Sequence, residues 1–336
     1  MENINKTEQP VVSIIIPVFN AADSLPVCIE SLMNQPYSEL ELIFVNDCST
    51  DNSLSVIAGY KERLEARGMK VKIIQHERNQ GVAAARNSGL DEVSGKYIYW
   101  VDADDWIEKN AVEKLVEEAE KTDAEIIGCN WYLSFHQNER LMNQSDFSSP
   151  EDGLKKMMAG VMRWNLWLFM LRRELLERNH IRFIPGLNMG EDMMVMMKLF
   201  ASAHRVSFLN AGLYHYKQTN QNSLSKIYSQ KHIEEVTANV NEVVRFLEGL
   251  NLGGGMEKYA MFLKLNIKLP LLISDQTDNF RLWNCWFSEA NIFVMKNRML
   301  PLRTRLLQWF AAKRMYIVNK LYFRVVIRTF YGIIYK

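Results

Sequence analysis

The sequence has few cysteines, and none stands in a pattern that predicts a metal site or a disulfide. The 336 residues include four cysteines, which lie far apart without Cys-x-x-Cys spacing. The chain also lacks an apolar run of the roughly 18 to 20 residues that a membrane-spanning helix needs. Its first ten residues are polar, so we expect no secretory signal. These absences favour a protein of the reducing cytosol.

Acidic residues are missing from the end of the chain, which hides an uneven distribution of charge. The formal net charge is +1, yet residues 296–336 contain ten Lys and Arg and no Asp or Glu. The preceding residues therefore contain 30 basic and 39 acidic side chains. An acidic body with a basic end argues against a general nucleic-acid binder and indicates a specific role for the last segment.

What the chain does contain is a succession of apolar, β-branched runs separated by amphipathic helical segments. We expect strands at residues 11–17, 41–45, 71–75, 97–101, 124–130 and 206–216. Strands that are linked by helices in this way pair in parallel. The pattern predicts an α/β fold with a mostly parallel sheet. Residues 137–150 are polar and without periodicity, and they predict a loop.

A cluster of carboxylates follows the fourth expected strand directly. Asp102, Asp104 and Asp105 fall within four residues. Like charges repel and Asp is a poor strand residue, so the cluster needs a cation or a strong set of hydrogen-bond donors. Ligands that are all oxygen favour Mg²⁺ or Mn²⁺ over zinc. The alternative is a solvated loop with helix-capping aspartates.

Polar residues also follow the first two strands, at Asn20 and Asp47. Ligands of open parallel sheets bind outside the carboxyl ends of the strands. We therefore expect Asn20, Asp47 and the carboxylates at 102–105 to converge on one crevice. A second acidic pair, Glu191 and Asp192, follows a glycine and begins a helix; its alternative role is to complement the helix dipole.

Five short segments, in order, resemble the inverting, nucleotide-sugar-dependent glycosyltransferases of family 2, which have the GT-A fold. They are SIIIPVFN at 13–20, LIFVNDCSTDNS at 42–53, NQGVAAARN at 79–87, VDADD at 101–105 and GED at 190–192. Each motif alone is weak, but five in order at suitable spacing are strong. The resemblance covers residues 10–220 and looks especially like bacterial enzymes of surface polysaccharide or lipopolysaccharide synthesis.

The resemblance assigns a role in binding the donor nucleotide to several residues. These are Pro17, Phe19, Asn20, Asp47, Gly81, Arg86, Asp102 and Ala103. The first three match the loop that walls the base, and Asp47 matches the acceptor for the uracil imide. Gly81 and Arg86 match the turn and helix near the diphosphate, where a guanidinium can pair with anionic oxygen. The sequence departs from the family pattern at Asn46, where an aspartate is frequent.

The resemblance also assigns the reacting groups. Asp104 matches a ligand of Mn²⁺ or Mg²⁺, with Asp105 as a candidate second ligand. Asp192 matches the general base, and Glu191 its neighbour on the acceptor side. Inversion needs a base for the attacking hydroxyl and a Lewis acid for the leaving diphosphate. Some GT-A enzymes complete the metal shell with a late histidine, which makes His215 a candidate; a packed, hydrogen-bonded histidine is the alternative.

The expected activity is transfer of a sugar from a nucleotide diphosphate sugar, with UDP as the expected carrier, to a glycan or a lipid-linked acceptor in cell-surface polysaccharide synthesis. One alternative is a sugar-nucleotide pyrophosphorylase, which needs a glycine-rich basic loop that residues 18–22 do not provide. The other is a catalytically idle nucleotide-binding module at the membrane surface. The intact Asp102, Asp104 and Asp192 argue against it.

Four parts are expected along the chain. They are a polar segment at 1–10, a GT-A domain at 11–225, a helical extension at 226–295 and a basic amphipathic tail at 296–336. On a helix, Phe310, Ile317, Leu321 and Val325 of the tail fall along one side. Such helices bind anionic membrane interfaces; the alternative is a terminal helix packed on the catalytic domain. We expect a cytoplasmic protein in peripheral contact with the anionic inner membrane, without nucleic acid.

Overall fold

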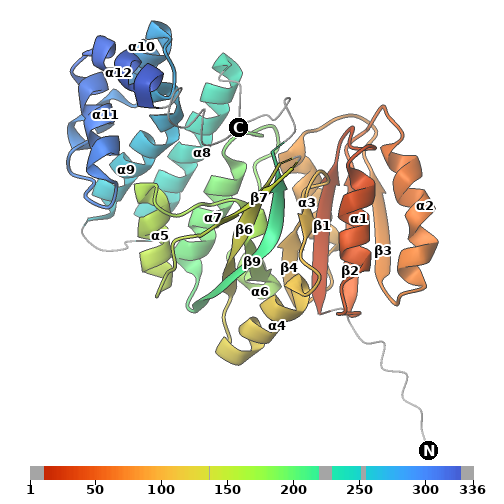
Figure 1. Cartoon of the computed structure of the whole chain (residues 1–336). Coiled ribbons are helices and arrows are strands. Elements are labelled where there is room, and N and C mark those ends of the chain that lie inside the picture. The colour runs from red at the N-terminus through yellow and green to blue at the C-terminus, as the bar shows by residue number, and fades with distance from the viewer. Residues whose placement is uncertain (1–10, 136, 219–228, 251–254, 327–336) are drawn as a thin grey trace, which may run out of the picture. The chain divides into compact units, whose positions relative to one another are not determined.

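The computed structural model describes residues 11–135, 137–218, 229–250 and 255–326 (Figure 1). The chain divides into two compact units. The first contains Met1–Asp152 and Trp164–Val243, and the second contains Gly153–Arg163 and Val244–Lys336. The predicted boundary at residue 225 lies outside the described residues, as do the polar segment 1–10 and residues 327–336 of the predicted tail.

The first unit is built on a nine-stranded sheet in the order β3-β2-β1-β4-β8-β6-β9-β5, with β7 also paired to β6. The strands are β1 (Val12–Val18), β2 (Leu40–Asn46), β3 (Lys70–Gln75), β4 (Tyr97–Trp100), β5 (Trp106–Ile107), β6 (Ile126–Ser134), β7 (Glu139–Met142), β8 (Phe169–Arg172) and β9 (Val206–Lys217). The pairs β1–β2, β2–β3 and β1–β4 are parallel, and β6 is parallel to β9. β5, β7 and β8 are antiparallel to their partners. The sheet is therefore mixed, and its β3-β2-β1-β4 half is the predicted parallel part.

The apolar runs located the main strands correctly. All six expected strands are present, as β1, β2, β3, β4, β6 and β9. The prediction of a loop over residues 137–150 is wrong at Glu139–Met142, which forms β7. Most of β7 is exposed, and the strand is held by backbone pairing with β6. Because β7 buries little apolar surface, it leaves no periodic signal in the sequence.

Helices cover the parallel half of the sheet. The helices of the first unit are α1 (Leu25–Met33), α2 (Ser53–Glu65), α3 (Val82–Glu92), α4 (Ala111–Thr122), α6 (Arg173–Arg178) and α7 (Glu191–Ser202), while α5 (Pro150–Ala159) and α8 (Gln230–Gly249) contribute to both units. α1 and α2 lie side by side in front of the strands (Figure 1). α3 packs closely on β1 and β2, since a Cβ at Gly89 would lie 2.5 Å from the Ile15 side chain.

The described part of the second unit is helical. Besides parts of α5 and α8 it contains α9 (Met256–Lys268), η3 (Leu269–Leu272), α10 (Thr277–Cys285), η4 (Ser288–Phe293), α11 (Leu302–Ala312) and α12 (Tyr316–Tyr322). Buried Lys268 donates from Nζ to the Trp286 carbonyl at 2.7 Å and to Asn291 Oδ1 at 2.6 Å. Burial lowers the pKa of Lys268 to about 7. Across the described ranges, the helices are all too short or too polar to cross a bilayer.

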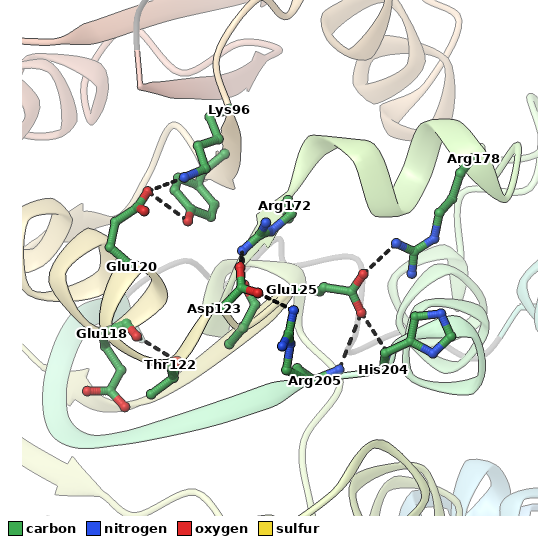
Figure 2. A network of polar contacts seen from close by, with 12 residues as sticks. Lys96, Glu118, Glu120, Thr122, Asp123, Glu125, Arg172, Arg178, His204 and Arg205 are labelled. Carbon is green, nitrogen blue, oxygen red and sulfur yellow. Dashed lines mark hydrogen bonds and ion pairs between the residues drawn. The ribbon is translucent and has the colours of Figure 1, made fainter.

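A network of ion pairs lies at the edge of the sheet where β4, β6 and β9 begin (Figure 2). Asp123 lies between Arg172 and Arg205 and pairs with both. Glu125 pairs with Arg178 at 2.5 Å and accepts hydrogen bonds from two backbone N–H groups of the segment that leads into β9. These bonds join the start of β6 to the end of β8, to α6 and to the start of β9.

Candidate active site

The loops that follow β1 and β2 are joined by hydrogen bonds at the carboxyl edge of the sheet. The side chain of Asn20 accepts the backbone N–H of Thr50 at 2.8 Å, and the Asn20 N–H donates to Ser49 Oγ at 3.0 Å. Asn20 has a φ of 50°, in the left-handed region that asparagine tolerates. The Ser24 hydroxyl donates to the carbonyl of Ala103 at 3.2 Å, which ties the first loop to the segment after β4.

Pro17 and Phe19 frame the same loop. Pro17 is the last but one residue of β1 and is paired with Val45 of β2. Phe19 follows the strand, and half of its surface is exposed. An exposed aromatic ring at this position can stack on a planar base.

Asp47, directly after β2, is buried and fixes the loop that leads to α3. Its Oδ1 accepts the N–H of Gln80 at 2.8 Å, and its Oδ2 accepts the N–H of Gly81 at 2.7 Å. His76 Nδ1 lies 2.7 Å from Oδ1, and His76 Nε2 lies 2.9 Å from Ser88 Oγ. Because a carboxylate accepts, the Nδ1 position carries a proton. Asp47 therefore holds the turn at the start of α3 through both of its oxygens.

Gly81 caps α3 and leaves space for a side chain from a distant part of the sequence. Its φ is 87°, and a Cβ at this position would lie 2.3 Å from the Asn188 side-chain nitrogen. Asn188 Oδ1 accepts the N–H of Ala83 at 3.1 Å. The segment before α7 is thereby held against the first turn of α3, which brings Gly190 and the acidic pair after it to this helix.

Arg86 on α3 is buried and contacts three carboxylates from two other segments. Its Nη1 donates to Glu191 Oε1 at 2.7 Å and also to Asp192 Oδ1. Its Nη2 lies 3.6 Å from Asp102 Oδ1. Asp192 Oδ2 further accepts the N–H of Leu166 at 3.3 Å. The structure thus brings Arg86, Asp102, Glu191 and Asp192 into one cluster, which we call the Arg86 cluster.

The Arg86 cluster contains three carboxylates and one guanidinium. The pKa values of two of these carboxyl groups are raised. Burial raises the pKa of Glu191 to about 8, and the neighbouring Asp192 adds to the rise while Arg86 opposes it. Partial burial raises the pKa of Asp102 to about 6, with Arg86 again opposing and with Asp104 and Asp192 contributing. One guanidinium does not neutralise these carboxylates. Strongly raised pKa values of this kind concentrate at functional sites.

Asp104 and Asp105 differ in their surroundings. Asp104 is half-buried, and its charge adds to the rise in the pKa of Asp102. Asp105 is buried: its Oδ2 accepts the Tyr214 hydroxyl and its Oδ1 accepts the N–H of Lys217, both at 2.8 Å. These bonds join Asp105 to β9. Within the described ranges, no group of three or more His, Cys, Asp or Glu is arranged to hold a metal ion.

His215 lies on β9 between two aromatic rings. It stacks on Trp106 at 5.1 Å and on Tyr132 at 4.7 Å between ring centroids. Its Nε2 lies 3.0 Å from Glu108 Oε1, and its Nδ1 lies 2.9 Å from Glu139 Oε1. Both ring nitrogens therefore face protein carboxylates, an arrangement that favours the packed, hydrogen-bonded histidine over a metal ligand.

Several residues that organise the site carry no signal in the sequence. His76 and Asn188 belong to loops, and neither is part of a motif. Glu235 and Asn239 of α8 hold the segment before α7, because Glu235 Oε2 accepts the Asn188 N–H at 3.0 Å and Asn239 donates to the Met189 carbonyl at 2.8 Å. The acidic and amide residues of an amphipathic helix are usually solvated, so their role is visible only in three dimensions.

Comparison with known proteins identifies the class. The model of glycosyl transferase family 2 matches residues 13–200, and the chain belongs to this family. It is 31% identical over 274 residues to the uncharacterized glycosyltransferase EpsJ of Bacillus subtilis (strain 168), which covers 79% of this chain and 78% of EpsJ.

Solved structures support the same fold. Staphylococcus aureus TarS 1-349 in complex with UDP-GlcNAc superimposes with a TM-score of 0.69 at 20% identity, covering 93% of this chain and 91% of that chain. The mannosyltransferase PcManGT from Pyrobaculum calidifontis, in complex with GDP-Man and Mn²⁺, has a TM-score of 0.53 at 16% identity over 95% and 88% of the two chains. The fold is the GT-A fold that the motifs predict, with a helical C-terminal part.

Proposed function

We propose that this glycosyltransferase moves a sugar, with inversion, from a UDP-linked donor to a glycan or lipid-linked acceptor in cell-surface polysaccharide synthesis. The observation that carries the proposal is the Arg86 cluster. It joins Asp102, the residue assigned to the donor, to Asp192, the residue assigned to the base. A displacement at the anomeric carbon needs these two sides within one site. The TarS structure contains UDP-GlcNAc, which supports the donor class.

In this proposal Asp192 removes the proton from the acceptor hydroxyl. Asp192 lies in the first turn of α7. Arg86 and the Leu166 N–H hold its two oxygens in a fixed direction. Glu191 beside it binds the acceptor. Phe19, Asn20, Asp47 and Gly81 form the walls of the nucleotide site.

We further propose a divalent cation, Mn²⁺ or Mg²⁺, at Asp104, with Asp102 beside it. Mg²⁺ and Mn²⁺ sites commonly use one or two carboxylates and take other ligands from phosphate and water. A bound cation supplies Lewis-acid stabilisation of the leaving diphosphate. The mutual repulsion of Asp102 and Asp104 supports this position, and we leave Asp105 and His215 out of the site because of their bonds to other side chains and to β9.

Binding of the donor can be tested by thermal denaturation of the full chain with a panel of nucleotide sugars, with and without Mn²⁺. A ligand that binds the folded state raises Tm by mass action. We expect a UDP-sugar with Mn²⁺ to give the largest rise and Asp104→Asn to remove the part that depends on Mn²⁺. Equal Tm values with every nucleotide sugar would contradict the proposal.

An idle nucleotide-binding module remains the second candidate, because it would keep the same nucleotide-binding residues. Release of UDP from the donor distinguishes the two. We expect the wild-type chain to release UDP slowly in water and faster with an acceptor, and Asp192→Asn to lower the acceptor-dependent part about 10²–10⁴-fold. UDP binding without release under any condition would favour the idle module.

For the place of action, we propose the inner face of the cell membrane.

A further inference from the structure

The last described helix exposes an aliphatic stripe. Ile317 and Leu321 of α12, and Val325 in the helical turn that follows, are 84%, 61% and 48% exposed. They are spaced by four residues, so they lie along one side of the helix. Isolated exposed aliphatic side chains are ordinary, but three in a row on one side are unfavourable in water and indicate a surface that is covered in use.

The orientation of this stripe is fixed by the other side of α12. Buried Asn319 donates from Nδ2 to the Leu307 carbonyl of α11 at 2.9 Å. The Tyr316 hydroxyl accepts a hydrogen bond from Asn284 Nδ2 at 3.0 Å, and its ring packs 5.6 Å from that of Phe280. Because these contacts seat α12 on α10 and α11, the aliphatic side chains are held outward.

Cations are close to the aliphatic stripe in the sequence. Lys313 and Arg314 precede α12 and are exposed, and Arg324, which lies 3.9 Å from Asp275, directly precedes Val325. Residues 296–326 contain eight Lys and Arg and no Asp or Glu. We call Lys313, Arg314, Ile317, Leu321 and Val325 together the basic apolar face.

We propose that the basic apolar face binds the interface of a bilayer that contains anionic phospholipid. Aliphatic side chains enter the boundary of the acyl chains while Lys and Arg meet the lipid phosphates. A second copy of this chain is disfavoured as the occupant, because self-pairing places the same cations of both copies against each other. The proposal adds a partner to the proposed function, but lipid binding itself does not depend on glycosyl transfer.

Co-sedimentation of the full chain with vesicles tests the face directly. One set contains phosphatidylcholine alone, and the other contains phosphatidylcholine mixed with phosphatidylglycerol. We expect binding to the mixed vesicles only, weakened by added salt because the electrostatic part is screened. Each basic residue near such a surface contributes about 1 kcal/mol, or about fivefold in affinity, so Lys313→Glu with Arg314→Glu lowers binding by more than about tenfold.

The aliphatic part has its own variant and a matched control. We expect Ile317→Ser, Leu321→Ser and Val325→Ser, combined, to reduce binding about tenfold or more with an unchanged Tm. Ile292→Ser serves as the control, since Ile292 is 73% exposed on η4 but lies outside the basic apolar face. If the combined variant unfolds at a lower temperature, Ile317→Ser alone is measured in its place.

Two results would overturn the proposal. One is equal sedimentation of the wild-type chain and the combined variant with mixed vesicles. The other is a wild-type dimer in solution that the combined variant loses, which would assign the face to a second copy. UDP release from the donor, measured on the same variants without vesicles, separates this proposal from the proposed function, because it should stay at the wild-type rate.

Discussion

The carboxylates at the two opposite edges of the sheet differ in their cationic partners and in their pKa values. Where β4, β6 and β9 begin, Asp123 has two arginines, Glu125 has one, and Glu120 has Lys96 at 2.5 Å (Figure 2). The pKa values of Glu120, Asp123 and Glu125 are all lowered, through hydrogen bonds to these cations that outweigh desolvation. Ionised carboxylates stabilise the folded state at this edge.

Where β1, β2 and β4 end, the balance is reversed. Asp102, Glu191 and Asp192 share the one guanidinium of Arg86, and the pKa values of Asp102 and Glu191 are raised. Ionising all of these groups therefore costs free energy unless a further cation or a substrate is present. The first edge is suited to holding strands together, and the second to binding and chemistry.

The largest effect is expected from Arg86→Ala. Removal of a buried cation leaves the neighbouring carboxylates uncompensated, which costs about 3–5 kcal/mol of folding free energy. We also expect glycosyl transfer to be lost. Urea denaturation and an assay of UDP release measure the two effects. Arg178→Ala is the control at the other edge, where the loss should be smaller and transfer should persist. An Arg86→Ala chain as stable as the wild type would refute the contrast between the edges.

Asp192→Asn is expected to separate activity from stability. General-base catalysis contributes about 10²–10⁴-fold, so the transfer rate should fall within that range while donor affinity stays unchanged. The free energy of unfolding should stay equal or increase, because one of several repelling charges is removed. Steady-state kinetics and urea denaturation provide the readouts. A variant that changes only KM would show that Asp192 binds substrate and is not the base.

Glu125→Gln is expected to lower the stability and to leave glycosyl transfer unchanged. The variant loses the ion pair to Arg178 and weakens two hydrogen bonds from backbone N–H groups. Hydrogen bonds to charged groups contribute about 1.5–3 kcal/mol, so we expect a loss of about 2 kcal/mol in the free energy of unfolding. Transfer per folded molecule should equal that of the wild type. A normal stability together with reduced transfer would assign Glu125 to the active site.

Glu191 is also expected to make the stability depend on pH. Its pKa is raised in the folded state, so between its ordinary value and about 8 the folded chain keeps a proton that the unfolded chain has released. Stability should therefore fall as the pH rises through this window, and Glu191→Gln should remove that part of the fall. Urea denaturation from pH 4.5 to pH 8, without divalent cations, measures it. The same slope in both proteins would contradict the raised pKa.

The sequence predicts the parallel half of the sheet because its strands are buried, apolar and separated by helices. It does not predict β5, β7 or β8, which are short or exposed and carry no periodic pattern. The motifs led to Arg86, Asp102, Glu191 and Asp192 one by one. Their shared contact could not be predicted, since it depends on how residues about a hundred positions apart are placed around α3.

The contact between Gly81 and Asn188 has a consequence for protein engineering. The space that a side chain at position 81 would fill is occupied by the amide of Asn188, 107 positions later. A substitution at position 81 therefore needs a matching change at position 188. A library that randomises position 81 alone will consist mostly of failures, because any side chain there meets this amide at a positive φ.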